Sequence, residues 1–547
     1  MRPTALVLLL VAGLAGCAAR HKPSEPAAAP IAFDDLGAYH HAVTTRSPEA
    51  QRWFDQGLRL IYGFNHEEAT RSFREAVRLD PGCAMGWWGI ALAAGPNYND
   101  PGNRERDKRA YESLEHALRL RPQVSEPERA YIDALAKRYT KEPPPDRKAL
   151  DVAYADAMRE VAHRYPDDLD AATLFAEAMM DLRPWDLWTP DGRPQPGTEE
   201  IVTTLESVLA RDPQHPGANH YYIHAVEASP HPERGLAAAG RLHDLVPGAG
   251  HLVHMPSHIY MRTGNYAEAV DANVRAVAVD ERYLERAKPA GLYPMMYYPH
   301  NIDFLWSAAS MDGRSAESLR AARRLEEVGK AHPEMLRKMP DIEGVAVTSR
   351  FVLARFGRWN DILAEPAPPE DLLFATGIHH YARGLAFVRT GRPDDAAAEL
   401  AALQKTADAT PPDRPLMQVN KQKDVLALAS AVLAGELAAA RGQNAEAVRD
   451  LEDAVQRQDA LRYMEPPPWY YPVRQSLGAV LLSAGRAKEA EAVYREDLQR
   501  NPNNGWSLYG LAQALRAQKK SAEAARVEEK FHRVWARADV ELAASRF

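Results

Sequence analysis

Two histidine pairs with the same internal spacing are the side chains of this sequence best suited to chemistry. His220 and His224 lie in NHYYIHAVEAS, and His254 and His258 lie in HLVHMPSHIYMRTG, 34 residues further along. A spacing of four residues places both members of a pair on one face of a helix. Imidazole nitrogens grouped in this way can bind a transition-metal ion or form hydrogen bonds to another ligand.

Further polar residues extend this series. His251 and His300 are expected on the same wall as the two pairs, and Glu227 and Asp303 are candidate carboxylates to orient the ligands or act as a general base. One metal ion would bind to the four paired imidazoles, with His251 or His300 completing its coordination. Zinc, copper and iron all suit such donors, and the order of affinities does not select among them. The candidate metal ligands are His220, His224, His251, His254, His258 and His300.

Two other interpretations of these histidines stay open. They could bind an organic or peptide ligand without a metal, or they could only form hydrogen bonds in the helix packing. The segment His220 to His224 is not a zinc-protease motif, because Tyr221 stands where the glutamate base belongs. Phosphate-binding loops and nucleophile elbows are missing from the sequence, so catalysis is undecided. Additional ligand-binding candidates are Asn97, Tyr98, Asn99, Tyr260 and Asn301.

A helical repeat is expected to position these side chains. Small, large and proline residues recur at fixed offsets, beginning with Trp53, Gly57, Leu60, Ala69, Phe73, Ala76 and Pro81. This pattern resembles the tetratricopeptide repeat, whose period is about 34 residues with one helix–turn–helix unit per period. The resemblance covers most of residues 48–535. It implies an all-α fold, a right-handed superhelix of helix–turn–helix repeats, with the first helix of each repeat facing a concave groove.

A narrower resemblance concerns a bacterial group of long tetratricopeptide proteins. The shared stretches are GPN, HYYIHAVEAS, HMPSHIYMRTGNY, YYPHN and NGWSLYGL. This resemblance implies no particular activity and assigns no catalytic residue.

The N-terminus resembles a bacterial lipoprotein signal peptide. The apolar run from Ala5 to Ala15 is too short to span a bilayer, and Leu14-Ala15-Gly16-Cys17 matches a lipobox, so Cys17 would be lipidated. Alanine rather than aspartate at residue 18 predicts an outer-membrane anchor facing the periplasm. Cys83 is the only other cysteine, so no disulfide framework is expected.

Composition and charge narrow the function further. The 547 residues carry a formal net charge of −8 and no long basic run, which argues against nucleic acid as a partner. We predict a lipid-anchored envelope protein that binds a protein, peptide or small ligand in its concave groove; the alternative is a metal-binding protein or metalloenzyme. The expected segments are a signal peptide (1–17), a flexible tether (18–47), an N-terminal repeat array (48–283), irregular central repeats (284–425) and C-terminal repeats with a capping helix (426–547).

Overall fold

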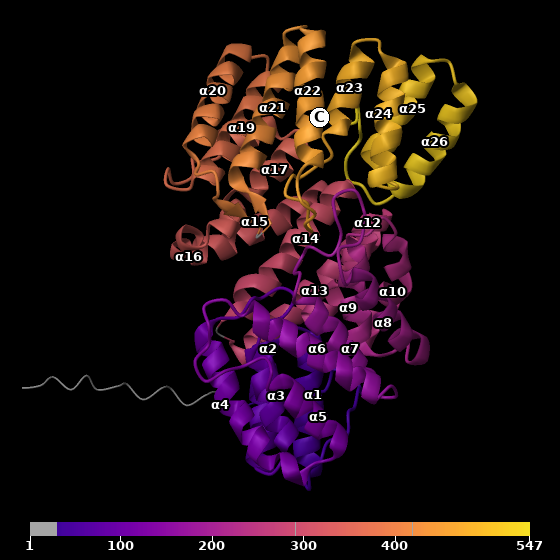
Figure 1. Cartoon of the computed structure of the whole chain (residues 1–547). Coiled ribbons are helices and arrows are strands. Elements are labelled where there is room, and N and C mark those ends of the chain that lie inside the picture. Colours follow the sequence, from indigo (N-terminus) through magenta and orange to yellow (C-terminus); the bar gives the residue numbers. More distant parts are fainter. Residues whose placement is uncertain (1–29, 290, 418) are drawn as a thin grey trace, which may run out of the picture.

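The prediction of an all-α repeat fold is confirmed. The computed structural model describes residues 30–289, 291–417 and 419–547, and these form an almost entirely helical superhelix (Figure 1). The only strands in these ranges are β1 (Pro415–Leu416) and β2 (Asn420–Lys421), which pair antiparallel. The predicted signal peptide with Cys17, and residues 18–29 of the predicted tether, lie outside the described residues. None of the described helices combines the length and apolar character needed to cross a membrane.

Helices of the N-terminal half pack mainly against their neighbours in sequence. They are α1 (Pro48–Tyr62), α2 (His66–Leu79), α3 (Ala84–Ala94), α4 (Arg104–Leu120), α5 (Glu126–Leu135), α6 (Lys148–Arg164), α7 (Leu169–Met180), α8 (Thr198–Arg211), α9 (Pro216–Glu227), α10 (Leu236–Leu245), α11 (Gly250–His254), α12 (Pro256–Thr263) and α13 (Tyr266–Ala287). Short 3₁₀ helices η1 (Arg121–Gln123) and η2 (Pro232–Gly235) and a π-helical turn, η3 (Tyr293–Tyr297), interrupt or follow this series.

The C-terminal half continues the same arrangement. It contains α14 (Tyr298–Met311), α15 (Ser315–Ala331), α16 (Pro333–Lys338), the 3₁₀ helix η4 (Pro340–Val347), α17 (Thr348–Arg355), α18 (Trp359–Ala364), α19 (Leu373–Arg389), α20 (Pro393–Ala409), α21 (Gln422–Ala440), α22 (Asn444–Asp459), α23 (Arg474–Ser483), α24 (Ala487–Arg500), α25 (Gly505–Ala517) and α26 (Ser521–Val534).

The close approach of paired helices depends on the small residues that the repeat pattern singled out. A Cβ atom on Gly57 would lie 2.6 Å from the ring of Phe73, and one on Gly89 would lie equally close to the same ring. Phe73 therefore fills the space that two glycines leave open, and α1, α2 and α3 pack around it.

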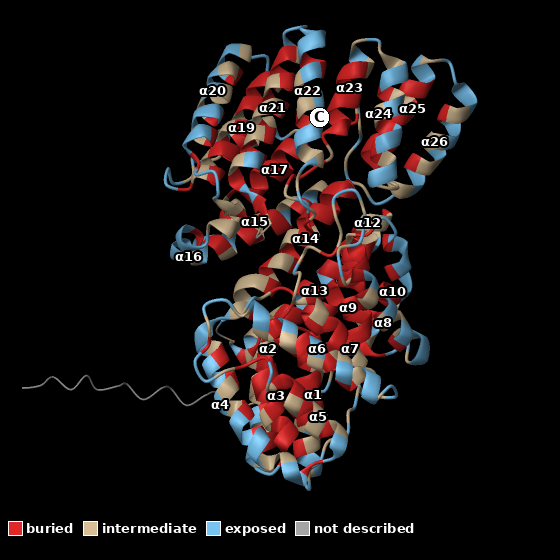
Figure 2. Ribbon diagram, viewed as in Figure 1, coloured by how far each residue is buried: buried red, intermediate tan, exposed pale blue. Residues whose placement is uncertain are grey.

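Two large apolar cores meet near α13 and α14. One extends from Leu36 to Tyr297 and the other from Val277 to Ala524. Figure 2 shows buried residues running through both halves and through the junction. The second core runs across residue 425 without a break, so the segments 284–425 and 426–547 share it.

Residues 30–47 belong to the folded unit. Leu36 is buried in the first core, Tyr39 donates a hydrogen bond to Asp170 (2.9 Å), and His41 Nδ1 lies 2.6 Å from the same carboxylate. Aromatic and imidazole side chains thus anchor this stretch to the helices. The folded unit thus begins before residue 48.

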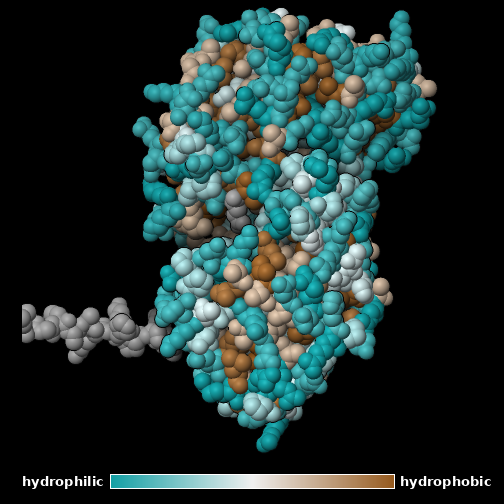
Figure 3. Space-filling view, viewed as in Figure 1, coloured by the Kyte–Doolittle hydropathy of each residue, from teal (hydrophilic) through white to brown (hydrophobic). Residues whose placement is uncertain are grey.

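The histidine-bearing helices lie near the junction of the two halves. Every residue of α9 is buried, and His215 caps its start by accepting a hydrogen bond from the Ala218 N–H (3.2 Å). Pro256 cannot donate a backbone hydrogen bond, and it starts α12 with one residue between it and the end of α11 at His254. The outer surface seen in Figure 3 is mainly hydrophilic over both halves, so the apolar environment of this region comes from burial within the superhelix.

Candidate metal centre

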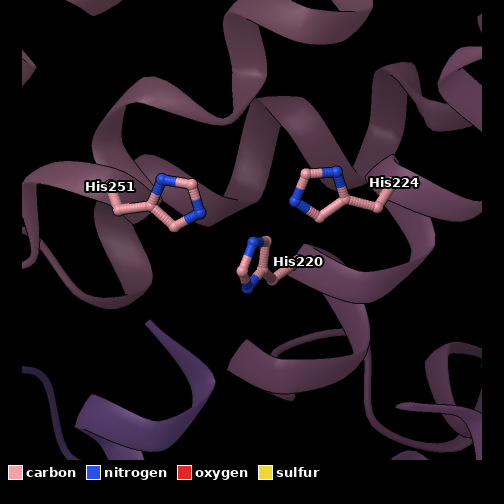
Figure 4. Close-up of side chains that lie close together, drawn as sticks. All are labelled: His220, His224 and His251. Atoms are coloured by element: carbon pink, nitrogen blue, oxygen red, sulfur yellow. The ribbon is translucent and has the colours of Figure 1, made fainter. Parts of the chain in front are cut away.

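Three of the predicted histidines form a first cluster, here called the first triad. His220 and His224 come from α9 and His251 from α11, and one ring nitrogen of each lies within 4.8 Å of the others. Figure 4 shows the three rings turned toward a common space. All three side chains are at most 1% exposed, so bulk water does not compete for their nitrogens.

Hydrogen bonds fix the tautomer of two rings in the first triad. His220 Nδ1 lies 2.6 Å from the Tyr62 carbonyl oxygen, and His224 Nδ1 lies 2.7 Å from Glu227 Oε1. Both partners only accept, so each Nδ1 carries the proton and each Nε2 has a free lone pair. Within the described residues, these Nε2 atoms and both nitrogens of His251 are buried without a hydrogen-bond partner. The first triad therefore presents ring nitrogens without hydrogen-bond partners, and their lone pairs are suited to bind a cation.

The other three predicted histidines form a second triad. His254 of α11, His258 of α12 and His300 of α14 also bring one ring nitrogen each within 4.8 Å. His254 Nδ1 lies 2.7 Å from Asn273 Oδ1, and the Asn273 amide donates to the Ala269 carbonyl (2.8 Å), which leaves its oxygen to accept. Asn273, on α13, therefore assigns the proton of His254 to Nδ1.

In the second triad, two ring nitrogens lie at a distance that requires a proton or a metal ion between them. His258 Nδ1 lies 2.5 Å from Glu227 Oε2, so its proton is also on Nδ1. His254 Nε2 and His258 Nε2 nevertheless lie 2.9 Å apart. Two unprotonated nitrogens at this distance repel each other, so either a proton or a metal ion must lie between them. Two nitrogens bound to one metal ion at about 2.0–2.1 Å and roughly a right angle would have about this separation.

Glu227 connects the two triads. Its two oxygens accept from His224 and His258, and Tyr463, from the C-terminal half, donates to Oε2 (3.1 Å). Burial raises the pKa of Glu227, but the adjacent His258 and His224 outweigh it and hold the pKa below its ordinary value. The triads are neighbours, with ring centres 5.4 Å apart for His224 and His258 and 5.8 Å apart for His251 and His254.

Burial keeps four of the imidazoles uncharged. Burial, assisted by neighbouring histidines, places the pKa values of His220, His251 and His254 well below the ordinary value. For the same reasons the pKa of His300 falls to about 3. Neutral imidazole is the form that binds metal ions, so these rings are ready ligands at neutral pH.

Aromatic side chains surround the triads. Phe64 lies 4.5 Å from the ring of His220, and Phe304 lies 4.5 Å from the rings of both His254 and His258. Trp185 approaches His224 at 5.7 Å. Phe64 and Trp185 adopt φ values of 55° and 57°, a backbone conformation that costs bulky residues on the order of 1–3 kcal/mol and that concentrates at functional sites.

The arrangement differs from the single site expected from the sequence. All six histidines are brought together, but as two triads instead of four ligands completed by a fifth. They also do not line an open groove: loops and the C-terminal half cover them. Glu227, the candidate orienting carboxylate, accepts hydrogen bonds from ring nitrogens of both triads. Asp303 accepts a hydrogen bond from the Trp306 indole N–H (2.6 Å). Burial raises the pKa of Asp303 to about 6.

Of the additional ligand-binding candidates, three lie beside the first triad and two make other contacts. Tyr98 lies 5.0 Å from the ring of His224, and its neighbours Asn97 and Asn99 are buried beside it in the loop after α3. Asn301 instead donates to Asp280 (2.7 Å), and Tyr260 is half-buried against the apolar residues of α13 and α14.

Sequence reasoning missed several contributors. Tyr463 is 236 residues from Glu227, and Asn273 and Tyr62 act on the histidines from separate helices. No local spacing marks these residues, because their roles depend on long-range packing.

A cavity of about 600 Å³ adjoins the first triad. Its lining includes His224 and Glu227, the loop between α7 and α8, and the C-terminal ends of α22 and α24. The cavity therefore lies where the two halves of the superhelix meet.

Comparisons with known proteins identify no family for this chain. No protein-family model and no curated protein matches the sequence. Among solved structures, the APC/C hetero-tetramer Cut9-Hcn1 matches with 12% identity and a TM-score of 0.29, over 90% of this chain and 76% of that one. The human IFIT1 dimer with m7Gppp-AAAA matches with 11% identity and a TM-score of 0.31, over 90% and 92%. The P58(IPK) TPR domain matches with 14% identity and a TM-score of 0.21, over 86% and 99%. At these TM-scores the matches carry no argument about function.

Proposed function

We propose that this protein binds two transition-metal ions in adjacent three-histidine sites. His220, His224 and His251 would hold one ion, and His254, His258 and His300 the other. Three protein ligands leave coordination positions open, as in metal sites that bind water or a substrate. The protein would thus be a metal carrier or a metalloenzyme.

The contact between His254 Nε2 and His258 Nε2 carries this proposal. In neutral rings, the hydrogen bonds on the other side place the proton on Nδ1, so both Nε2 atoms carry lone pairs, and they lie 2.9 Å apart in a buried site. Either a proton or a metal ion must relieve the repulsion. Burial and the neighbouring histidines lower the pKa of His254, which disfavours a proton held on that ring, and a metal ion would relieve the repulsion for both rings.

The donor set narrows the choice of metal. Six imidazole nitrogens with no thiolate among them suit zinc, copper, iron or nickel more than magnesium or calcium, which prefer oxygen ligands. Glu227 bonds to ring nitrogens of His224 and His258, and so acts as the partner that orients two ligands.

The location and partners of the protein form a separate part of the proposal. The lipobox at Cys17 supports a lipid anchor in the bacterial cell envelope, facing the periplasm from the outer membrane. Repeat superhelices present extended surfaces to partners. A protein or peptide would bind such a surface and not the histidines, which are buried too deeply to meet it.

Metal analysis of the purified protein tests the proposal. We expect about two equivalents of a transition metal per chain after loading and desalting. His251→Ala and His258→Ala should each remove about one equivalent, with the helical circular dichroism unchanged. His116→Ala is the matched control, since His116 stacks on Trp87 away from both triads. Less than about a tenth of an equivalent in the wild type, or unchanged content in both variants, would refute the proposal.

A further inference from the structure

The cavity beside the first triad has the dimensions of a small-molecule site. Its volume of about 600 Å³ falls in the range of about 300–1,000 Å³ that is usual for organic ligands. Both halves of the protein contribute to its wall, and Arg462 bridges the halves through an ion pair to Asp186 (2.9 Å). Such a junction is a common place for ligands to bind.

Aromatic side chains form the wall nearest to the first triad. Tyr98 and Trp185 lie 5.3 Å apart, and both contact the ring of His224. Trp188 also lines the cavity, and its indole is held by a hydrogen bond to the Ala225 carbonyl (2.8 Å). Stacked or edge-on contacts with these rings favour a flat aromatic molecule over a saturated one of similar size.

The backbone of Trp185 adds an independent observation. Its φ of 57° is unfavourable for a bulky residue, and glycine would adopt it without strain. The surrounding structure therefore holds this indole between the cavity and His224 at a cost in stability. Strain of this kind is typical of residues that contact ligands.

Hydrogen bonding at the inner end of the cavity limits the ligand further. Glu227 lines the cavity, and its two oxygens accept hydrogen bonds from His224, His258 and Tyr463. Its Oε1 accepts one hydrogen bond, from His224, and a carboxylate oxygen can accept two. Arg262 directs its guanidinium to the carbonyls of Glu227 (2.9 Å) and Ser229 (3.4 Å). This end therefore favours a hydroxyl donor over an anion, which has no proton to donate.

We infer that the cavity binds a small uncharged aromatic molecule with a hydroxyl group, of which phenol is the simplest. The ring would lie against Trp185 and Tyr98, and the hydroxyl would point toward Glu227. The ligand would then be next to the first metal site, so its role as a substrate rests on the proposed function. Its binding depends on the cavity alone.

Isothermal titration calorimetry with three probes tests this inference on the full-length protein. Phenol is the ligand probe, cyclohexanol retains the size and hydroxyl without the aromatic ring, and benzoate retains the ring with a negative charge. We expect cyclohexanol to bind about 2- to 12-fold more weakly than phenol, as aromatic contacts predict. Benzoate should bind more weakly than phenol as well.

Two substitutions at Trp185 separate binding from folding. Trp185→Gly removes the indole and also relieves the strained backbone, so the protein should remain folded while its affinity for phenol falls about 10-fold. Trp185→Phe should retain most of the affinity. Trp87→Leu, away from the cavity, is the control and should bind phenol like the wild type.

The same samples are analysed for metal, which separates the two proposals. Phenol binding that requires Trp185 supports the cavity site, whether or not metal is present; metal-free protein with such binding would overturn only the metal proposal. If phenol binds no better than cyclohexanol, or equally well to wild type and Trp185→Gly, the inference is wrong even with two metal ions bound.

Discussion

Replacing Glu227 with glutamine tests how the two triads are linked. The carboxylate accepts from His224 Nδ1 at 2.7 Å and from His258 Nδ1 at 2.5 Å. A glutamine side chain has one accepting oxygen, and its amide group can only donate. One of the two imidazoles must therefore move its proton to Nε2 or turn away, and it then loses the lone pair directed at the metal.

The expected loss of metal affinity follows from the number of hydrogen bonds that each side chain can accept. Loss of a hydrogen-bonding partner behind a metal-bound histidine typically weakens metal affinity by about 10- to 100-fold, or about 1.4–2.8 kcal/mol. Glutamine can support one histidine, so Glu227→Gln should weaken one site by this factor and spare the other. Glu227→Ala should weaken both sites.

Chelator competition followed by metal analysis measures the two affinities. Glu233→Gln is the matched control, because Glu233 pairs with His231 at the exposed surface (3.2 Å). If both sites of Glu227→Gln bind metal as tightly as they do in the wild type, Glu227 does not orient the ligands. Weakening of both sites in Glu233→Gln would point to a general loss of stability.

Two further predictions concern packing and pH. Gly57→Ala places a Cβ 2.6 Å from the Phe73 ring and should destabilise the protein by about 1–3 kcal/mol. Gly240→Ala, with nothing within 4 Å of the new Cβ, should instead stabilise α10 by about 0.5–1 kcal/mol. Urea denaturation of both variants measures these changes, and equal effects on stability would contradict the packing argument. Burial opposes the charge of His41, but the hydrogen bond and the charge of Asp170 prevail and raise its pKa to about 9. Because the folded pKa lies above the unfolded value, the stabilisation from His41 is fully present below about pH 6.5 and is lost as the pH rises through about 9. His41→Asn should therefore cost at most about 3 kcal/mol at pH 6 and far less at pH 10, and a cost that does not change with pH in denaturation experiments would show that the charge of His41 is not involved.

Much of the fold could be predicted from local patterns. Small and large residues at fixed offsets predict paired helices because the contacts between Gly57 and Phe73 join neighbouring elements of one repeat. The spacing of His220 and His224 places both on one helical face for the same reason: helix geometry depends only on position along the chain.

The sequence by itself thus determined the helical class, the repeat spacing and the six candidate ligands. Only the tertiary structure decided how they divide. His251 of α11 joins the histidines of α9, whereas its neighbour His254 joins His258 and His300. Hydrogen bonds to Tyr62, Glu227 and Asn273 orient the other four rings, and these partners come from α1, α9 and α13.

Coverage of the centre was also decided by tertiary structure. Tyr463 reaches Glu227 from the other half of the chain, and Trp185 closes the cavity wall from a loop. Contacts between residues that are distant in sequence follow from the packing of the whole superhelix. The periodicity of a single helix carries no record of them.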